Sequence, residues 1–160
     1  MRLYFGISLI ISVLFSSCIT QPEITSADFI NFGSEGMVKD QQYLITVTPV
    51  DSLMSDIPVD VILLVRYTSS FSYSVLPLLI EEENIAEDNP LSERKIDIIL
   101  FDDKKQSSLH GSHNIFEAYD TLSRSLRLEN ERKFYISTPL SHSVGIKSIG
   151  ILTRQANIDK

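Results

Sequence analysis

The chain has 160 residues, and its 14 Lys and Arg against 21 Asp and Glu give a formal net charge of −7. Nucleic acid and anionic lipid headgroups are negative too, so this charge argues against either as the main partner. The single cysteine, Cys18, excludes an internal disulfide, and stability must come from the apolar core of one domain.

The first 18 residues have the layout of a secretory signal. Arg2 supplies one positive charge, Leu3 to Phe15 form an apolar run, and two small serines stand directly before Cys18. The run is shorter than the roughly 20 residues that a membrane-spanning helix needs. Two other interpretations are a buried core helix with an incidental cysteine and an ordinary signal peptide that is cleaved elsewhere.

Cys18 gives this signal a specific meaning, because Phe15-Ser16-Ser17-Cys18 resembles the bacterial lipobox. The resemblance implies cleavage before Cys18, acylation of its sulfur and a palmitate-bearing mature N-terminus. Several acyl chains make such an anchor permanent, since each buried CH₂ contributes about 0.8 kcal/mol. No Asp or Glu follows Cys18 closely. By resemblance to the sorting rules of diderm bacteria, this predicts the outer membrane, facing the periplasm.

Behind the signal peptide of residues 1–17, we expect a tether over residues 18–40 and one domain over residues 41–160. A proline and two glycines interrupt any period in the tether, which leaves one short strand near Phe29–Phe32. Alternating or continuous apolar runs predict further strands at Tyr43–Val50, Val59–Tyr67, Tyr73–Glu82, Lys95–Asp102, Asn114–Tyr119, Lys133–Thr138 and Ser148–Arg154. Seven or eight short strands without a clear helix indicate an all-β protein with a single antiparallel β-sandwich.

Four segments carry more specific expectations. Val59–Tyr67 is apolar almost throughout, which is typical of a central strand covered on both faces. Pro77 cannot donate to a ladder, and it predicts an edge strand or a bulge. Glu81–Pro90 is predicted to be an acidic loop. Thr121–Arg132 fits a helix through two leucines four residues apart, but its later alternation favours a hairpin.

Several short motifs occur in an order that resembles a known family. They are Val65–Tyr67 with Tyr73, Leu100–Asp102 with Gly111, Lys133–Ile136, and Val144–Ile151. Together with the lipobox, this order resembles the GldH-like gliding-motility lipoproteins of the Bacteroidetes over roughly Phe29 to Thr153. The chain departs from that pattern at Met37, Ser72 and Asn130–Glu131 and would be a divergent member. The resemblance implies a cell-envelope lipoprotein, with the motility machinery as its partner.

Two groups of side chains suggest hydrolytic or metal chemistry. His110 and His113 lie near Asp102 and Asp103, and two imidazoles with a carboxylate are zinc ligands, although no third ligand is defined. Solvated loop histidines are the simpler interpretation. The run Ser141-His142-Ser143 offers a hydroxyl and a base, but a polar turn explains it better because no G-x-S-x-G motif is present.

Two further groups suggest binding. The acidic residues from Glu81 to Asp88 lack the spacing of a calcium loop, so a solvated acidic loop is expected instead. Tyr67, Phe71 and Tyr73 form a candidate aromatic patch for glycan or partner contact, but at least two of the three are expected to pack in the core or at an edge. We expect no metal and no cofactor.

These patterns favour a non-enzymatic outer-membrane lipoprotein that is anchored through Cys18. It would act as a structural or interaction component of a cell-envelope complex, without nucleic acid or small-molecule substrate. The strand that contains Pro77 is the candidate surface for pairing with a partner strand. The alternative is a surface carbohydrate-binding or polysaccharide-handling lipoprotein. An esterase or metal hydrolase that uses His110, His113 or His142 is the third possibility.

Overall fold

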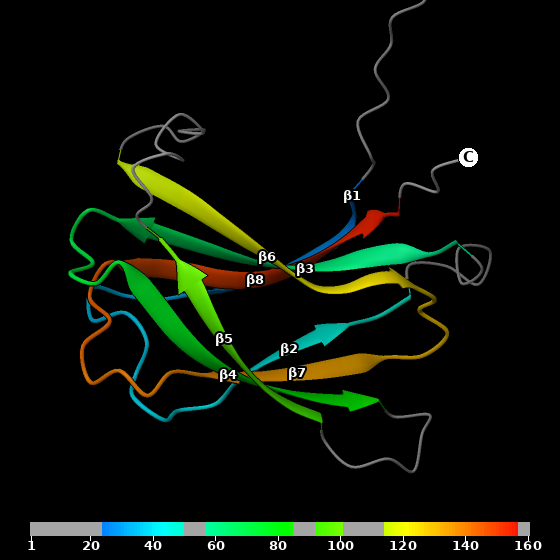
Figure 1. Cartoon of the computed structure of the whole chain (residues 1–160), viewed down its shortest axis with the longest axis horizontal. Coiled ribbons are helices and arrows are strands. Elements are labelled where there is room, and N and C mark those ends of the chain that lie inside the picture. The colour runs from blue at the N-terminus through cyan, green and yellow to red at the C-terminus, as the bar shows by residue number, and fades with distance from the viewer. Residues whose placement is uncertain (1–23, 50–56, 85–91, 101–113, 157–160) are drawn as a thin grey trace, which may run out of the picture.

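A computed structural model of the chain describes residues 24–49, 57–84, 92–100 and 114–156, and these residues form two stacked sheets (Figure 1). Sheet A has the strand order β1-β8-β3-β6, and sheet B has the order β2-β7-β4-β5. The strands of sheet A are β1 (Ile24–Asn31), β8 (Ile146–Gln155), β3 (Val59–Thr68) and β6 (Ile115–Leu126). Those of sheet B are β2 (Tyr43–Val47), β7 (Arg132–Ser137), β4 (Val75–Asn84) and β5 (Ser92–Ile99).

All neighbouring strands are antiparallel, and the pairs follow one rule. The first strand pairs with the last, β2 with β7, β3 with β6, and β4 with β5. This is a long hairpin rolled up on itself, and the two contacts that close the roll are β3 with β8 and β4 with β7. The topology is that of a jelly roll. The prediction of an all-β antiparallel sandwich is thus confirmed.

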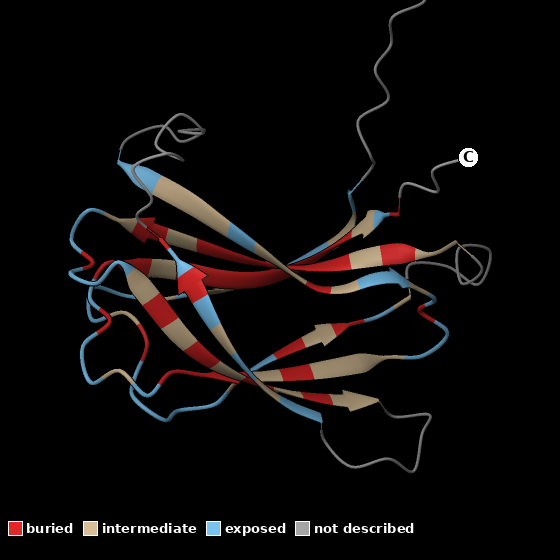
Figure 2. Ribbon diagram, viewed as in Figure 1, coloured by how far each residue is buried: buried red, intermediate tan, exposed pale blue. Residues whose placement is uncertain are grey.

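The core lies between the sheets and follows the two-residue period of each strand. From sheet B it takes Ile45, Leu78, Ile80, Phe134 and Ile136, with their neighbours of the same period. From sheet A it takes Val61, Leu63, Val65, Tyr67, Ile146, Ile149 and Ile151. Strand β3 is buried along nearly its whole length in Figure 2. It is a central strand, as its continuous apolar run predicted.

The prediction of an edge strand or a bulge at Pro77 is wrong, because β4 is a central strand between β7 and β5 and its ladder with β5 has no register shift at Pro77. Its ladder with β7 begins only at Leu79, opposite Ser137. The Pro77 carbonyl accepts a hydrogen bond from Thr138 Oγ1 at 2.9 Å, just past the end of β7. The N–H and C=O of one residue point to the same side of a strand. The N–H that Pro77 lacks would therefore point beyond the end of β7, where the ladder between β4 and β7 has ended. The proline is tolerated there without lying on an edge strand.

Three boundaries also differ from the predicted ones. Glu81 to Asn84 continue β4, although an acidic loop was expected. Strand β6 runs on to Leu126 and pairs with β3, while β7 pairs in the other sheet, so Thr121–Arg132 is neither a helix nor a hairpin. The third boundary is the start of the domain, because β1 belongs to sheet A and the described fold begins at Ile24 within the expected tether.

The register of β7 makes a direct prediction. Phe134 points into the core and is 1% exposed, whereas Lys133 lies on the opposite face of the same strand. We expect Phe134→Ala to lower the free energy of unfolding by about 3–5 kcal/mol, because it removes a ring and leaves a cavity. Lys133→Ala should change it by less than about 0.5 kcal/mol. Urea denaturation checks both, and equal losses would contradict this register.

Candidate interaction surface

The Ser141-His142-Ser143 run does not assemble a catalytic group in the structure. Ser143 is buried, and its hydroxyl donates to the Met37 carbonyl at 2.6 Å. Ser141 and His142 are exposed on the same loop. Gly36, at φ +72°, brings the facing loop so close that a Cβ would lie 2.0 Å from the Ser143 carbonyl oxygen. Ser143 therefore fastens two loops together, as expected of a polar turn.

Other predicted residues lie outside the described part of the chain. These are Cys18, His110, His113 and the neighbouring carboxylates Asp102 and Asp103. Among the described residues, no group of three or more His, Cys, Asp or Glu is placed to hold a metal ion. Within that same part of the chain, no helix has the length and apolar character needed to cross a bilayer.

The three aromatic residues proposed as a patch do not form one. Tyr67 and Phe71 are buried in the core, and only Tyr73 is exposed, with its ring 5.5 Å from that of Phe71. The Tyr67 hydroxyl donates a short hydrogen bond to the Leu100 carbonyl, which ties sheet A to the end of β5. Burial raises the pKa of Tyr67. The expectation that at least two of the three pack inside is confirmed.

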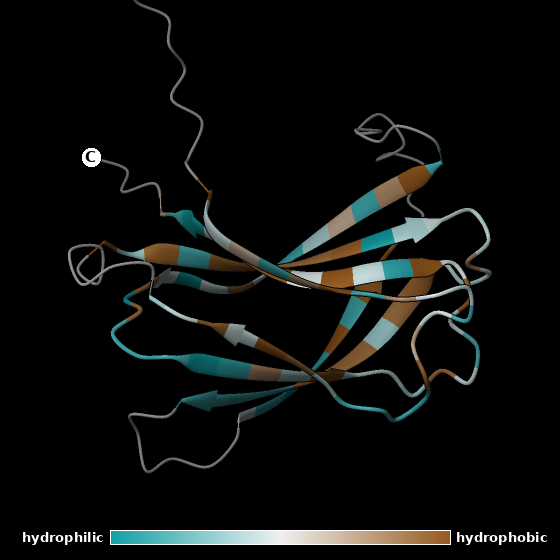
Figure 3. Ribbon diagram, turned by 180° about the vertical axis from the view of Figure 1, so that it is seen from behind, coloured by the Kyte–Doolittle hydropathy of each residue, from teal (hydrophilic) through white to brown (hydrophobic). Residues whose placement is uncertain are grey.

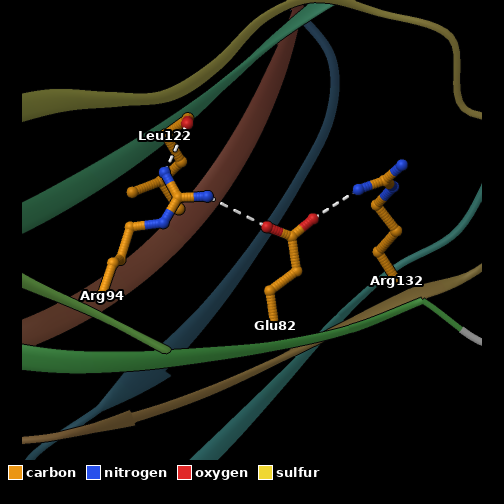
Figure 4. A network of polar contacts seen from close by, with 4 residues as sticks. All are labelled: Glu82, Arg94, Leu122 and Arg132. Atoms are coloured by element: carbon orange, nitrogen blue, oxygen red, sulfur yellow. Dashed lines mark hydrogen bonds and ion pairs between the residues drawn. The ribbon is translucent and has the colours of Figure 1, made fainter. Parts of the chain in front are cut away.

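Glu82 is the charged residue most deeply placed in the described fold, at 8% exposure (Figure 4). Alternation along β4 directs it between the sheets, in line with the apolar stripe that ends at Ile80. One carboxylate oxygen meets Arg132 Nη1 at 2.5 Å, and the other meets Arg94 Nη2 at 3.1 Å. Arg94 also donates from Nη1 to the Leu122 carbonyl at 2.6 Å.

This cluster of Glu82, Arg94 and Arg132 holds strands together and leaves no carboxylate oxygen for a ligand. It joins β4, β5 and β7 of sheet B to β6 of sheet A through one carboxylate. A buried carboxylate is costly unless it is paired and hydrogen-bonded, and here both oxygens are bonded to cations. We therefore assign it a structural role.

The outer face of sheet A carries a second apolar cluster, which we call the outer cluster. Ile62, Leu64 and Leu152 are buried there on the side away from sheet B, and Phe29 packs against them. Because an outer face normally points to water, four apolar residues at its centre distinguish it from an ordinary solvated face. The outer face of sheet B differs, because strand alternation places Glu81, Glu83 and Lys133 there, within the hydrophilic ends of β4 and β7 that Figure 3 shows.

Phe29 covers the outer cluster because a glycine lies beneath it. Gly150 is paired with Phe29 across β1 and β8, and a Cβ there would come within 2.1 Å of the ring. Arg66 lies over the ring, with its guanidinium carbon 4.8 Å from the ring centroid, in a cation–π contact. Arg66 in turn pairs with Glu117 at 2.8 Å. The Phe29 ring and the Arg66–Glu117 ion pair thus cover the outer cluster.

Tyr119 lies on the edge strand β6, on the outer face of sheet A, and is 59% exposed. Its hydroxyl donates a short hydrogen bond to Glu117, two residues away on the same face of β6. Partial burial and the Glu117 carboxylate raise the pKa of Tyr119 to about 12. Ile115 at the start of β6 and Ile24 at the start of β1 are also exposed. The exposed apolar surface of sheet A therefore lies around the outer cluster.

The four edge strands differ in how well they resist pairing with another strand. Strand β2 has only five residues, and β5 presents Glu93, Lys95 and Asp97. In β1, Asp28 accepts a hydrogen bond from the next backbone N–H, that of Phe29, at 2.9 Å. In β6, Asp120 does the same for Thr121.

Of these protections, the first half of β6 has only the cap at its end, Asp120, and one further carboxylate, Glu117, which is paired with Arg66. Residues Ile115–Asp120 form a regular ladder with β3 and contain no Lys, Pro or Gly, whereas the ladder shifts register beyond Thr121. Backbone groups on the side of β6 away from β3 meet no further strand among the described residues. This segment is the best candidate for strand addition that the described chain offers.

Comparison with known proteins adds no family to these observations. No protein-family model matches the chain, and no curated protein matches it significantly. The resemblance to GldH-like lipoproteins therefore stays a prediction.

The sequence held partial signals for this surface. Ile62 and Leu64 stand on the less apolar side of the β3 pattern and already indicated burial on both faces. The role of Phe29 in covering the outer cluster could not be predicted from the sequence, because its glycine partner, Gly150, lies 121 positions further along the chain.

The Glu82 cluster makes a prediction about stability. Glu82→Gln preserves the shape of the side chain but leaves two arginines without their counter-charge, so we expect a loss of about 3–5 kcal/mol in the free energy of unfolding. The neighbouring Glu81→Gln, on the outer face with Gln42 at 3.1 Å, should cost less than about 1 kcal/mol. Thermal and urea denaturation check this, and an unchanged Glu82→Gln variant would refute the assigned role.

Tyr119 makes a prediction about titration. The phenol should ionise near pH 12, measured as the difference in absorbance near 295 nm between the wild type and Tyr119→Phe. Glu117→Gln should lower this pKa, since it removes the carboxylate that opposes the phenolate. Because the pKa is raised on folding, the stability linked to Tyr119 is fully present below its unfolded pKa of about 10 and is lost as the pH rises toward 12. An unshifted pKa in wild type would contradict the Glu117 contact.

Proposed function

We propose that the protein is a lipid-anchored, non-enzymatic interaction component of the bacterial cell envelope. The anchor is Cys18, and the binding element is the edge of β6 at Ile115–Asp120. The observation that carries this proposal is the contrast among the four edges. Strand β2 is short, β5 presents three charged side chains and β1 is capped, whereas this half of β6 pairs regularly with β3, is apolar at four of its six positions and has its Glu117 paired with Arg66. A partner strand would extend sheet A at that edge through main-chain hydrogen bonds.

The side-chain chemistry of the described residues supports a binding role. Glu82 bridges two arginines, Ser143 bonds a backbone carbonyl, and Tyr67 bonds another across the two sheets. Each of these groups is engaged in joining parts of the fold. The exposed apolar side chains and the strand edges of the described residues remain available to recognise another surface.

The envelope location rests on the lipobox resemblance at Cys18, and the motility machinery as partner rests on the resemblance to GldH-like lipoproteins alone. In this proposal the protein is an outer-membrane lipoprotein that faces the periplasm. It also accounts for the single cysteine, because acylation consumes a thiol that would otherwise be unpaired in an oxidising compartment.

The anchor is tested by labelling cells that express the full chain with a palmitate analogue. We expect label on the wild type and recovery in the detergent phase after phase partitioning. Cys18→Ala should lose the label and move to the aqueous phase, because no acyl chains remain. Unlabelled wild type, or a Cys18→Ala variant that keeps its label, would contradict the proposal.

The binding element is tested with a photoreactive amino acid placed at Tyr119. We expect a discrete cross-linked adduct in native envelopes, and Ile115→Lys should reduce its yield several-fold because a charge on the edge opposes strand addition. Leu44→Lys on the edge strand β2 is the matched control and should leave the yield unchanged. Both positions are exposed, so folding should be unaffected. Equal yields from all three proteins would refute binding at β6.

A further inference from the structure

Chain length limits how far the fold can stand from an anchor at Cys18. Strand β1 begins at Ile24, six residues after Cys18. A fully extended chain covers roughly 3.3–3.6 Å per residue, so the start of β1 lies within about 20 Å of the acylated sulfur. Some surface of the sandwich must therefore approach the bilayer closely. This step rests on the lipid anchor proposed above.

The two outer faces differ in charge, which indicates the surface that approaches. The charged side chains on the regular part of the sheet A face form two ion pairs, Arg66 with Glu117 at 2.8 Å and Arg154 with Asp60 at 3.4 Å. The strand alternation places six charged residues on the sheet B face, four of them acidic: Glu81, Glu83, Glu93, Asp97, Lys95 and Lys133. Phosphate headgroups repel this excess of carboxylates, whereas the sheet A face is balanced.

The sheet A face also has the apolar residues that a bilayer interface accepts. Ile24 and Tyr119 are each 59% exposed, and Ile115 is 37% exposed. They surround the outer cluster, whose centre is already apolar. A tyrosine is suited to the headgroup region because its ring is apolar and its hydroxyl is polar. Ile24 stands where the chain enters the fold from the anchor.

We propose that the outer face of sheet A lies against the bilayer that holds the acyl chains of Cys18. Ile24, Ile115 and Tyr119 enter the headgroup region, and the acidic face of sheet B points away from the membrane. The apolar contact area is too small to bind a membrane alone, but the tether supplies a high effective concentration of lipid. The anchor thus fixes the orientation of the domain as well as its location.

The experiment uses the lipidated full chain in phosphatidylcholine vesicles. The protein contains no tryptophan, so a single introduced tryptophan reports its own surroundings. With brominated lipid in the vesicles, Tyr119→Trp should lose about half of its fluorescence and shift to shorter wavelength, because a face that docks enters the interface by about 5–10 Å. Leu44→Trp, on the outer face of sheet B and 47% exposed, is the matched control and should be neither quenched nor shifted.

Mass spectrometry of the acyl chains separates the two proposals. If the wild type carries no acyl chains, the proposed anchor fails, and the orientation that depends on it falls too. If the chains are present but the tryptophan at position 119 stays unquenched, or the one at position 44 is quenched equally, the orientation alone is overturned. Ile115→Trp provides a second probe on the same face if Tyr119→Trp does not fold.

Discussion

The end of the sandwich at which β4 stops depends on one buried carboxylate. Glu82 follows Ile80 on the inward side of β4, where an uncompensated charge would be expelled into water. Arg132 and Arg94 hold it in place, and this allows β4 to continue its ladder with β7 as far as Asn84. Because Arg94 also reaches the Leu122 carbonyl, the same cluster fastens β6 to the opposite sheet. A chain without an internal disulfide thus gains a polar link between its layers.

Burial on both faces of β3 is the second constraint, and it gives sheet A its distinct outer surface. The inward side chains of β3 join the main core, while Ile62 and Leu64 form the outer cluster under Phe29 and Arg66. Gly150 is essential to this arrangement, since any side chain there would lift the aromatic ring from the sheet. The outer face is left apolar and electrically balanced, which is the property that separates it from the acidic face of sheet B.

The parts of the fold that follow a local period were predictable from the sequence. Alternation located β2, β7 and β8 to within a few residues, and the continuous apolar run identified β3 as central. Three consecutive glutamates, in contrast, indicated a loop, because the arginines that neutralise Glu82 lie 12 and 50 residues away in the chain. Pro77 indicated an edge for the same kind of reason: Thr138, which replaces the ladder at that point, is 61 residues distant. Long-range partners decided each of these cases, and Cys18, the proposed site of lipidation, lies outside the described residues.

The strand order of sheet A makes the proposed anchor and the proposed binding edge compatible. In the order β1-β8-β3-β6, the strand nearest to Cys18 and the strand open to a partner occupy opposite edges of one sheet. Three strand spacings of about 4.8 Å separate them, or roughly 14 Å across the face. A partner strand that adds to β6 therefore extends the sheet away from the tether and does not compete with it. If sheet A lies on the bilayer, such a partner is also held at the membrane surface, so the same face that orients the domain brings its binding edge to the layer in which other anchored proteins are found.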